Sequence, residues 1–233
     1  VLVFVGSVVA AARAANLRTD RDVAPQLTPA TYDVAMSTRL MHMCAAAYCP
    51  TGIGNWTCNA CVEAGFNVTT IATESTWELL AYVGYDPTAD AVVVAFRGSS
   101  NLPNWILDLW ATQTHTKYPH CNCEVESGFY KAHEELKAQI IAPVHNLLAQ
   151  HAGAELHITG HSLGAAMAVL SGAHFQTQEN IDVHQLYTFG LPRVGDANFS
   201  KWFHENLPGA IHVTHYHDIV PHLPPQWLFG YHH

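Results

Sequence analysis

A serine between two glycines constrains this chain more than any other feature. The motif Gly160-His161-Ser162-Leu163-Gly164 follows the apolar run LHIT, which predicts a strand, and precedes AAMAVLSGAHF, which predicts a helix of small residues. In that context G-x-S-x-G is typical of a nucleophile elbow, a turn so tight that the residues flanking the serine must be small. The hydroxyl then projects above a sheet, and the N–H of Leu163 points to where an oxyanion would form. The alternative is a Gly-Ser-Gly turn that only caps a helix.

Strands and helices alternate around this motif. Strands are predicted over 77–84, 91–96, 156–159, 184–189 and 210–215, and helices over 31–48, 129–150, 163–175 and 196–205. The first two strands are joined through the turn residues 86–90 and form a hairpin. The alternation in the second half predicts an α/β fold, with a mainly parallel sheet covered on both faces.

The composition excludes several classes of protein. Hydrophobic residues make up 49% of the 233 residues and charged residues only 12%, which excludes an intrinsically disordered chain. The formal net charge of −9 argues against a nucleic-acid partner. No repeat or low-complexity linker divides the sequence, so we expect one domain over residues 15–233.

The first 14 residues have the composition of part of a secretory signal peptide. The run VLVFVGSVVA is apolar, and Ala12-Arg13-Ala14 fits an A-x-A cleavage site. The run is too short for a membrane span, so we expect no transmembrane segment. Because an initiator Met and a basic region are missing, we expect that the sequence begins within a leader and that the protein is secreted. The alternative is a buried N-terminal helix or strand.

Six cysteines fit an extracellular protein that forms disulfides. The pairs Cys58-x-x-Cys61 and Cys121-x-Cys123 would also suit zinc, which is the less favoured alternative once a signal peptide is assumed. The sequence leaves the disulfide connectivity open.

A nucleophilic serine needs a histidine base that a carboxylate orients. In a fold with this elbow the chain order is serine, then acid, then histidine. The acids after Ser162 are Glu179, Asp182, Asp196, Glu205 and Asp218. Asp218 alone directly follows a predicted strand, at a sheet edge where catalytic loops lie, so we predict that it is the triad acid.

Four ordered motifs resemble the landmarks of the class 3 (fungal-type) lipases. They are VVVAFRGSSNLPNWILDL, ITGHSLGAAMAVLSG, LYTFGLPRVGD and THYHDIVPHLPP, and the resemblance runs from about Thr31 to the last residue. It implies an α/β-hydrolase fold, Ser162 as nucleophile, Asp218 as triad acid, and Ser99 with Leu163 in the oxyanion hole. It implies no metal and no cofactor. It also implies a structural role for Arg193, which we expect in an ion pair.

The segment NLPNWILDLWAT (101–112) occupies the place of the family's lid. Its apolar side chains Leu102, Trp105, Ile106 and Leu109 could cover a cleft in water and open against a lipid surface. The alternative is a permanently buried core helix. An apolar lid favours lipid esters at an oil–water interface as substrate.

The resemblance leaves the triad histidine unassigned. In the family this histidine lies several tens of residues after the aspartate, whereas only fifteen residues follow Asp218 here. His232 and His233 come in the right order, although the connection to Ser162 is short. The family also pairs the counterpart of Cys49 with a cysteine near the C-terminus. We therefore expect that the natural protein continues, with both the histidine and that cysteine.

The sequence thus predicts a secreted, monomeric triacylglycerol lipase. A feruloyl-type or short-chain esterase is the alternative with the same chemistry. A lipase-like protein that binds lipid or a partner without catalysis is the alternative of another class.

Overall fold

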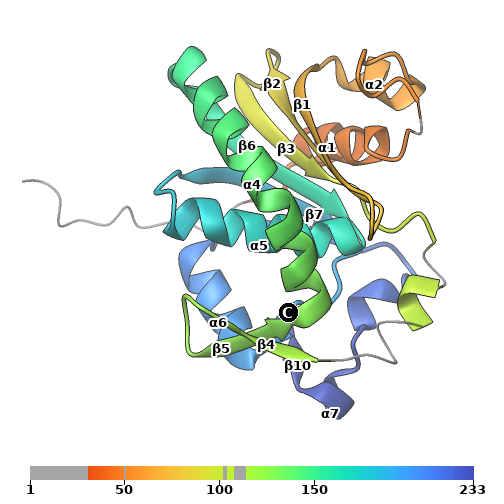
Figure 1. Cartoon of the computed structure of the whole chain (residues 1–233), viewed down its shortest axis with the longest axis vertical. Helices are drawn as coiled ribbons and strands as arrows, with labels where there is room; N and C mark the ends of the chain where they lie inside the picture. The colour runs from red at the N-terminus through yellow and green to blue at the C-terminus, as the bar shows by residue number, and fades with distance from the viewer. Residues whose placement is uncertain (1–30, 50, 102–103, 108–113) are drawn as a thin grey trace, which may run out of the picture.

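The computed structural model describes residues 31–49, 51–101, 104–107 and 114–233, so the predicted leader lies outside the described residues. A central sheet has the strand order β1-β2-β3-β6-β7-β9 (Figure 1). Its strands are β1 (Asn67–Glu74), β2 (Leu79–Asp86), β3 (Ala91–Phe96), β6 (Glu155–His161), β7 (Val183–Phe189) and β9 (Ala210–Val213). The pairings from β3 to β9 are parallel, whereas β1, β2 and β3 are antiparallel neighbours. The predicted mainly parallel sheet is therefore confirmed.

Helices cover both faces of this sheet. The long helix α4 (Ser127–Gln150) and α5 (Leu163–Thr177) lie on one face, and α1 (Val34–Ala46) lies on the other (Figure 1). The strand β3 shows why both faces must be covered, since all six of its residues are fully buried. Successive side chains of a strand point to opposite faces, so Val94 packs with α4 and α5 while Val93 packs with α1.

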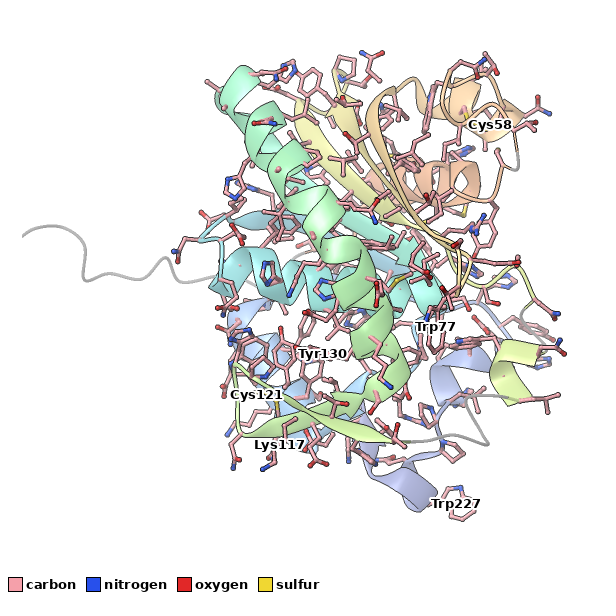
Figure 2. All side chains as sticks on the ribbon, viewed as in Figure 1. Cys58, Trp77, Lys117, Cys121, Tyr130 and Trp227 are labelled. Carbon is pink, nitrogen blue, oxygen red and sulfur yellow. A yellow bond between two sulfur atoms is a disulfide. The ribbon has the colours of Figure 1, made fainter. Side chains whose placement is uncertain are left out.

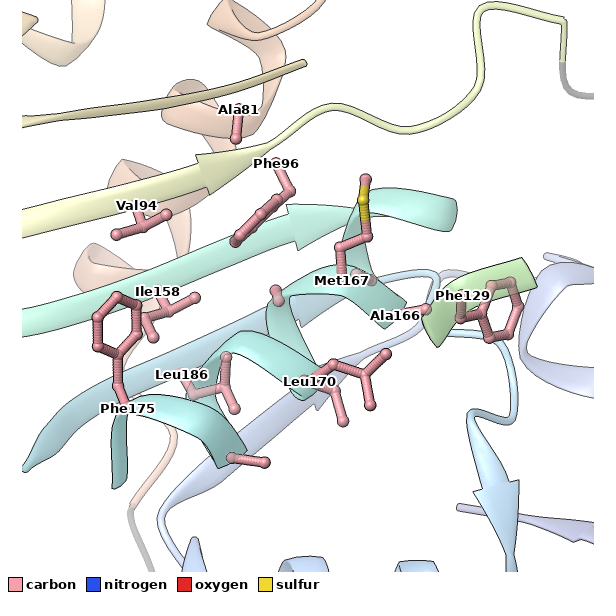
Figure 3. Close-up of a cluster of buried hydrophobic side chains, with 14 of the residues drawn as sticks. Ala81, Val94, Phe96, Phe129, Ile158, Ala166, Met167, Leu170, Phe175 and Leu186 are labelled. Carbon is pink, nitrogen blue, oxygen red and sulfur yellow. The ribbon is translucent and has the colours of Figure 1, made fainter. Parts of the chain in front are cut away.

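The core on the α5 face consists of branched strand residues against small and flexible helix residues. Figure 3 shows Phe96 and Ile158 of the sheet beside Met167 and Leu170 of α5. Full burial of each such side chain stabilises the fold by about 1.5–3 kcal/mol. The small residues that follow Ser162 let α5 lie close to the sheet, which holds the start of this helix against the ends of β3 and β6.

A second, four-stranded sheet was not predicted. Its order is β10-β8-β5-β4, with β4 (His115–Tyr118), β5 (Cys123–Glu126), β8 (Gly195–Asp196) and β10 (Tyr231–His232). Strands of two to four residues carry too little periodicity to be recognised from sequence. The remaining elements are α2 (Asn59–Ala64), α6 (Ala197–Asn206), a 3₁₀ turn η1 (Val220–His222) and α7 (Gln226–Phe229).

Disulfides join Cys58 to Cys61 and Cys121 to Cys123. Figure 2 labels Cys58 and Cys121, which lie at opposite ends of the molecule. The disulfide interpretation of these pairs is confirmed, and Cys44 and Cys49 are free thiols in the structure.

Arg193 differs from its prediction. Its guanidinium donates to the carbonyl oxygens of His222 (2.6 Å) and Pro224 (2.8 Å). It makes no ion pair with a carboxylate of the described residues. Arg193 therefore holds the segment after Asp218 by donating to its backbone carbonyl oxygens. The predicted ion pair is wrong for the residues that the structure describes.

Within the ranges that the structure covers, no helix is long and apolar enough to cross a membrane.

Candidate active site

The backbone at Ser162 has the strained geometry of a nucleophile elbow. Ser162 joins β6 to α5 with φ 58° and ψ −127°, a conformation that costs a non-glycine residue about 1–3 kcal/mol. A Cβ atom on Gly160 would collide with the carbonyl oxygen of Gly164, and one on Gly164 would collide with that of Phe96. Both glycines are thus needed for the strand, the turn and the helix to pack this closely.

The Ser162 hydroxyl is held without a partner. The side chain is 1% exposed, and its Oγ makes no hydrogen bond with the residues that the structure describes. The Ser162 N–H donates to the carbonyl oxygen of Phe189 (3.0 Å), which ties the elbow to the end of β7. Because no side chain caps α5, its first N–H groups stay available to an anion beside the serine.

A pocket of about 340 Å³ brings the segment after β3 together with the start of α5, which is far away in the sequence. Ser99 from the loop after β3, Leu163 at the start of α5 and Trp105 from the predicted lid all line it. The other lining residues are Trp77, Leu79, Asn101, Asn104, Glu126, Gly128, Phe129 and Ala132. The two residues predicted for the oxyanion hole therefore share one pocket wall.

Part of the predicted lid is described. Residues 104–107 form a helical turn in which Trp105 stacks on Phe129 of α4, with ring centroids 6.2 Å apart. Ile106 is half-buried, whereas Leu107 is 66% exposed. Leu102 and Leu109 lie outside the described residues. This turn presents one apolar side to the pocket wall and another to solvent.

Asp218 lies at the same end of β7 as Ser162. It follows β9, and its Oδ1 accepts the N–H of Val220 (2.9 Å). Its Oδ2 lies 2.6 Å from the point where a side chain on Gly190 would begin, and Gly190 has a left-handed φ of 57°. Gly190 directly follows Phe189, the residue that binds the Ser162 N–H. The structure thus brings the predicted nucleophile and acid to one turn.

The two C-terminal histidines lie elsewhere. Gln226 donates to Nδ1 of His232 (3.1 Å), and Nε2 of His233 donates to the carbonyl oxygen of Pro221 (2.6 Å). Both rings line a small cavity beside α6. The pairing of β10 with β8 in the second sheet holds them there, so neither hydrogen-bonds to Ser162 or Asp218.

Two polar side chains near the site were not predicted. Tyr48, two residues after the end of α1, accepts the N–H of Gly98, which precedes Ser99, and its hydroxyl also lies within hydrogen-bonding distance of His161. Glu126 lines the pocket, its Oε2 accepts the N–H of Phe129 (2.8 Å), and burial raises the pKa of its carboxyl group. Neither lies in a local motif, since both reach the site through contacts between segments remote in the sequence.

The chain is similar to known lipases. The family described as lipase (class 3) matches residues 93–227. A lipase from Rhizomucor miehei is 34% identical over 197 residues, which cover 81% of this chain and 53% of that protein. A secreted mono- and diacylglycerol lipase from Fusarium solani is 37% identical over 153 residues, covering 66% and 45%.

A solved structure gives the same result. A triacylglycerol lipase whose catalytic centre is described as a serine protease triad superposes with a TM-score of 0.78 and 29% identity, over 85% of this chain and 76% of that one. The fold is therefore that of the α/β-hydrolases. The chain spans about half the length of the curated relatives it matches. By the extent of the family match and the shared fold, the chain belongs to the class 3 lipase family.

Proposed function

We propose that the protein is a secreted serine carboxylic ester hydrolase that cleaves acylglycerol esters, a triacylglycerol lipase. The observation that carries the proposal is the Ser162 hydroxyl. It stands unbonded on a strained elbow at the uncapped start of α5, and Leu163 beside it lines an apolar pocket. Backbone strain of this kind is common at active sites, where it holds a reactive side chain in position.

The proposed reaction uses the residues around that hydroxyl. A histidine base takes the Ser162 proton as Oγ attacks the ester carbonyl carbon, and Asp218 orients the base and stabilises its charged form. The N–H of Leu163 and the donors of Ser99 bind the oxyanion, and loss of one such donor typically costs about 3–4 kcal/mol. The protonated histidine gives the proton taken from Ser162 to the leaving alcohol. The same histidine then takes a proton from water as water attacks the acyl-enzyme, and returns it to Ser162 as the acid is released. No histidine of the described residues hydrogen-bonds to the Ser162 hydroxyl, so the proposal assigns the base to no particular residue.

The pocket and its rim favour lipid esters. Trp77, 56% exposed, stands at the pocket, and Leu107 is exposed on the turn that carries Trp105 (Figure 2 labels Trp77). Exposed apolar side chains beside an apolar pocket suit a substrate at an oil–water interface. The Fusarium relative named as a secreted mono- and diacylglycerol lipase, the solved triacylglycerol lipase and the two disulfides support an extracellular acylglycerol lipase. That it acts as a monomer is part of the proposal.

The first experiment tests whether Ser162 is the nucleophile and whether the chain supplies its own base. The chain is incubated with a p-nitrophenyl alkylphosphonate, with and without free imidazole as an external base, and the modified residue is mapped by mass spectrometry. We expect modification at Ser162 and none in S162A, with imidazole accelerating the reaction if the chain supplies no base of its own. Absence of labelling under both conditions would contradict the proposal and favour the non-catalytic binding protein.

Substrate class is tested on the same preparations. Hydrolysis of emulsified tributyrin is compared with that of methyl ferulate and of soluble p-nitrophenyl butyrate, below and above the solubility limit of tributyrin. We expect the highest rate on the emulsion. A preference for methyl ferulate or the soluble ester would contradict the lipase assignment and favour the feruloyl-type or short-chain esterase.

A further inference from the structure

The half-buried tyrosine Tyr48 contacts two segments of the candidate site from the α1 side of the sheet. Oη of Tyr48 accepts the N–H of Gly98 (3.0 Å) and lies 2.7 Å from Nδ1 of His161. Gly98 directly precedes Ser99, and His161 directly precedes Ser162. Tyr48 therefore touches the neighbour of the oxyanion residue and the neighbour of the nucleophile at once.

The directions of these two hydrogen bonds follow from chemistry. The Gly98 N–H can only donate, so the tyrosine oxygen accepts it and keeps one proton to give. The acceptor within reach is Nδ1 of His161, because the opposite tautomer would leave the proton of this half-buried hydroxyl without a partner among the described residues. Nδ1 is then unprotonated, and the ring proton of His161 lies on Nε2.

Both groups stay neutral at pH 7, which keeps this pattern intact. Burial raises the pKa of Tyr48 to about 12. Burial also lowers the pKa of His161, and the nearby charge of Asp218 only partly opposes this shift. The tyrosine thus keeps its proton, and the imidazole keeps only one.

The Nε2 end of His161 lies on the side of Asp218. Nε2 of His161 and Oδ2 of Asp218 lie 3.8 Å and 2.6 Å from the same point beside Gly190. A protonated Nε2 there presents a positive N–H dipole toward the carboxylate. An unprotonated Nε2 would instead present a lone pair and repel it.

The space around Gly98 shows how tightly the two segments are coupled. A Cβ atom on Gly98 would collide with Oη of Tyr48 and lie 3.1 Å from Cβ of Ser162. The loop that carries Ser99 is therefore packed against the elbow, with the tyrosine hydroxyl between it and His161. A shift of this hydroxyl would move both segments.

We propose that Tyr48 is a positioning residue, which holds the Gly98–Ser99 loop beside Ser162 and fixes His161 as the Nε2–H tautomer facing Asp218. The inference rests on the proposed function, because it assigns Tyr48 to support the oxyanion residue and the acid of that reaction. Tyr48 itself touches neither Ser162 nor the pocket in the described structure.

The first test reads the tautomer directly. Two-bond ¹H–¹⁵N NMR spectra of the ¹⁵N-labelled full chain at pH 7 locate the ring proton of His161, with H161Q used for assignment. We expect an unprotonated Nδ1 in the wild type and a gain of Nδ1–H in Y48F. The matched control is Y82F, because the hydroxyl of Tyr82, a fully buried residue, also bonds to another segment by donating to the carbonyl oxygen of Met43 (2.7 Å). A wild-type His161 protonated at Nδ1, or an unchanged tautomer in Y48F, would overturn the inference.

The second test reads the chemistry at Ser162. We expect Y48F to slow phosphonylation of Ser162 about tenfold, as loss of a buried hydrogen bond would, and Y82F to stay within about twofold of the wild type. Equal rates for Y48F and Y82F would remove the positioning role. If the wild type itself is not labelled, the proposed function fails, and the tautomer measurement still decides whether Tyr48 sets the state of His161.

Discussion

The starts of α4 and α5 face the same pocket and are built in opposite ways. Glu126 precedes α4 with an extended backbone, and its carboxylate accepts the N–H of Phe129. Ser162 precedes α5 with a left-handed φ, and its hydroxyl caps nothing. Glu126 and Leu163, one from each helix start, line the same pocket.

The difference separates a structural helix start from a functional one. Among the described helices of ten or more residues, α1, α4 and α6 each begin with a carboxylate that accepts a backbone N–H. Such caps stabilise a helix by about 0.5–2 kcal/mol. The start of α5 forgoes this contribution and also carries backbone strain, so its N–H groups stay open to a developing negative charge.

Among changes at the two helix starts, G164A at the start of α5 should have the largest effect on the free energy of unfolding. The added Cβ would collide with the backbone carbonyl of Phe96, which cannot move as a side chain could. We expect a loss of about 3 kcal/mol or more in the free energy of unfolding, measured by urea denaturation. G172A in the same helix is the control, because its Cβ would meet only the ends of flexible side chains, those of Leu186 at 3.1 Å and Leu207 at 3.4 Å. Equal effects of the two variants would contradict the close packing of the elbow.

Changes at Ser162 should stabilise the fold while removing reactivity. S162G relieves the left-handed strain and removes the unbonded hydroxyl, so we expect a gain of about 2 kcal/mol in the free energy of unfolding. S162A removes only the hydroxyl and should gain less. Both should lose phosphonate labelling. A destabilised S162G would show that the elbow is not strained.

Removing the cap of α4 should destabilise the fold, whereas the changes at Ser162 should stabilise it. E126A leaves the N–H of Phe129 without its acceptor, and we expect a loss of about 1–2 kcal/mol in the free energy of unfolding. E126Q keeps an acceptor oxygen and should lose less. If E126A is as stable as the wild type, Glu126 contributes nothing as a cap, and the contrast with Ser162 disappears.

The smallest expected effect is the contribution of Glu126 to the pH dependence of the free energy of unfolding. Burial raises the pKa of the Glu126 carboxyl group in the folded protein, so the folded state binds this proton more tightly than the unfolded state. Its contribution to stability is therefore present below the ordinary glutamate pKa and lost as pH rises through the folded value. Unfolding free energies from pH 4 to 7 should fall more steeply, or rise less, in the wild type than in E126Q. Parallel curves would contradict this account.

Much of the fold could be predicted because its signals are local. The apolar run of β3, the small residues of α5 and the G-x-S-x-G spacing around Ser162 can each be recognised within a few residues of sequence. The short strands of the second sheet could not be predicted, because two to four residues carry no period. The placement of His232 and His233 depends on that sheet and was missed with it.

The sequence by itself determined the elbow, the alternation of strands and helices, and the choice of Ser162 and Asp218 as the pair to examine. Short local patterns carry these features: the alternating apolar runs, the acid that follows a strand-like run, and the glycines at 160 and 164. Only the tertiary structure decided that Ser99 shares a pocket with Leu163 and that Tyr48 reaches Gly98 and His161, residues 50 and 113 positions away. These contacts join segments that are far apart in the sequence and meet only when helices pack on the sheet, so no local pattern specifies them.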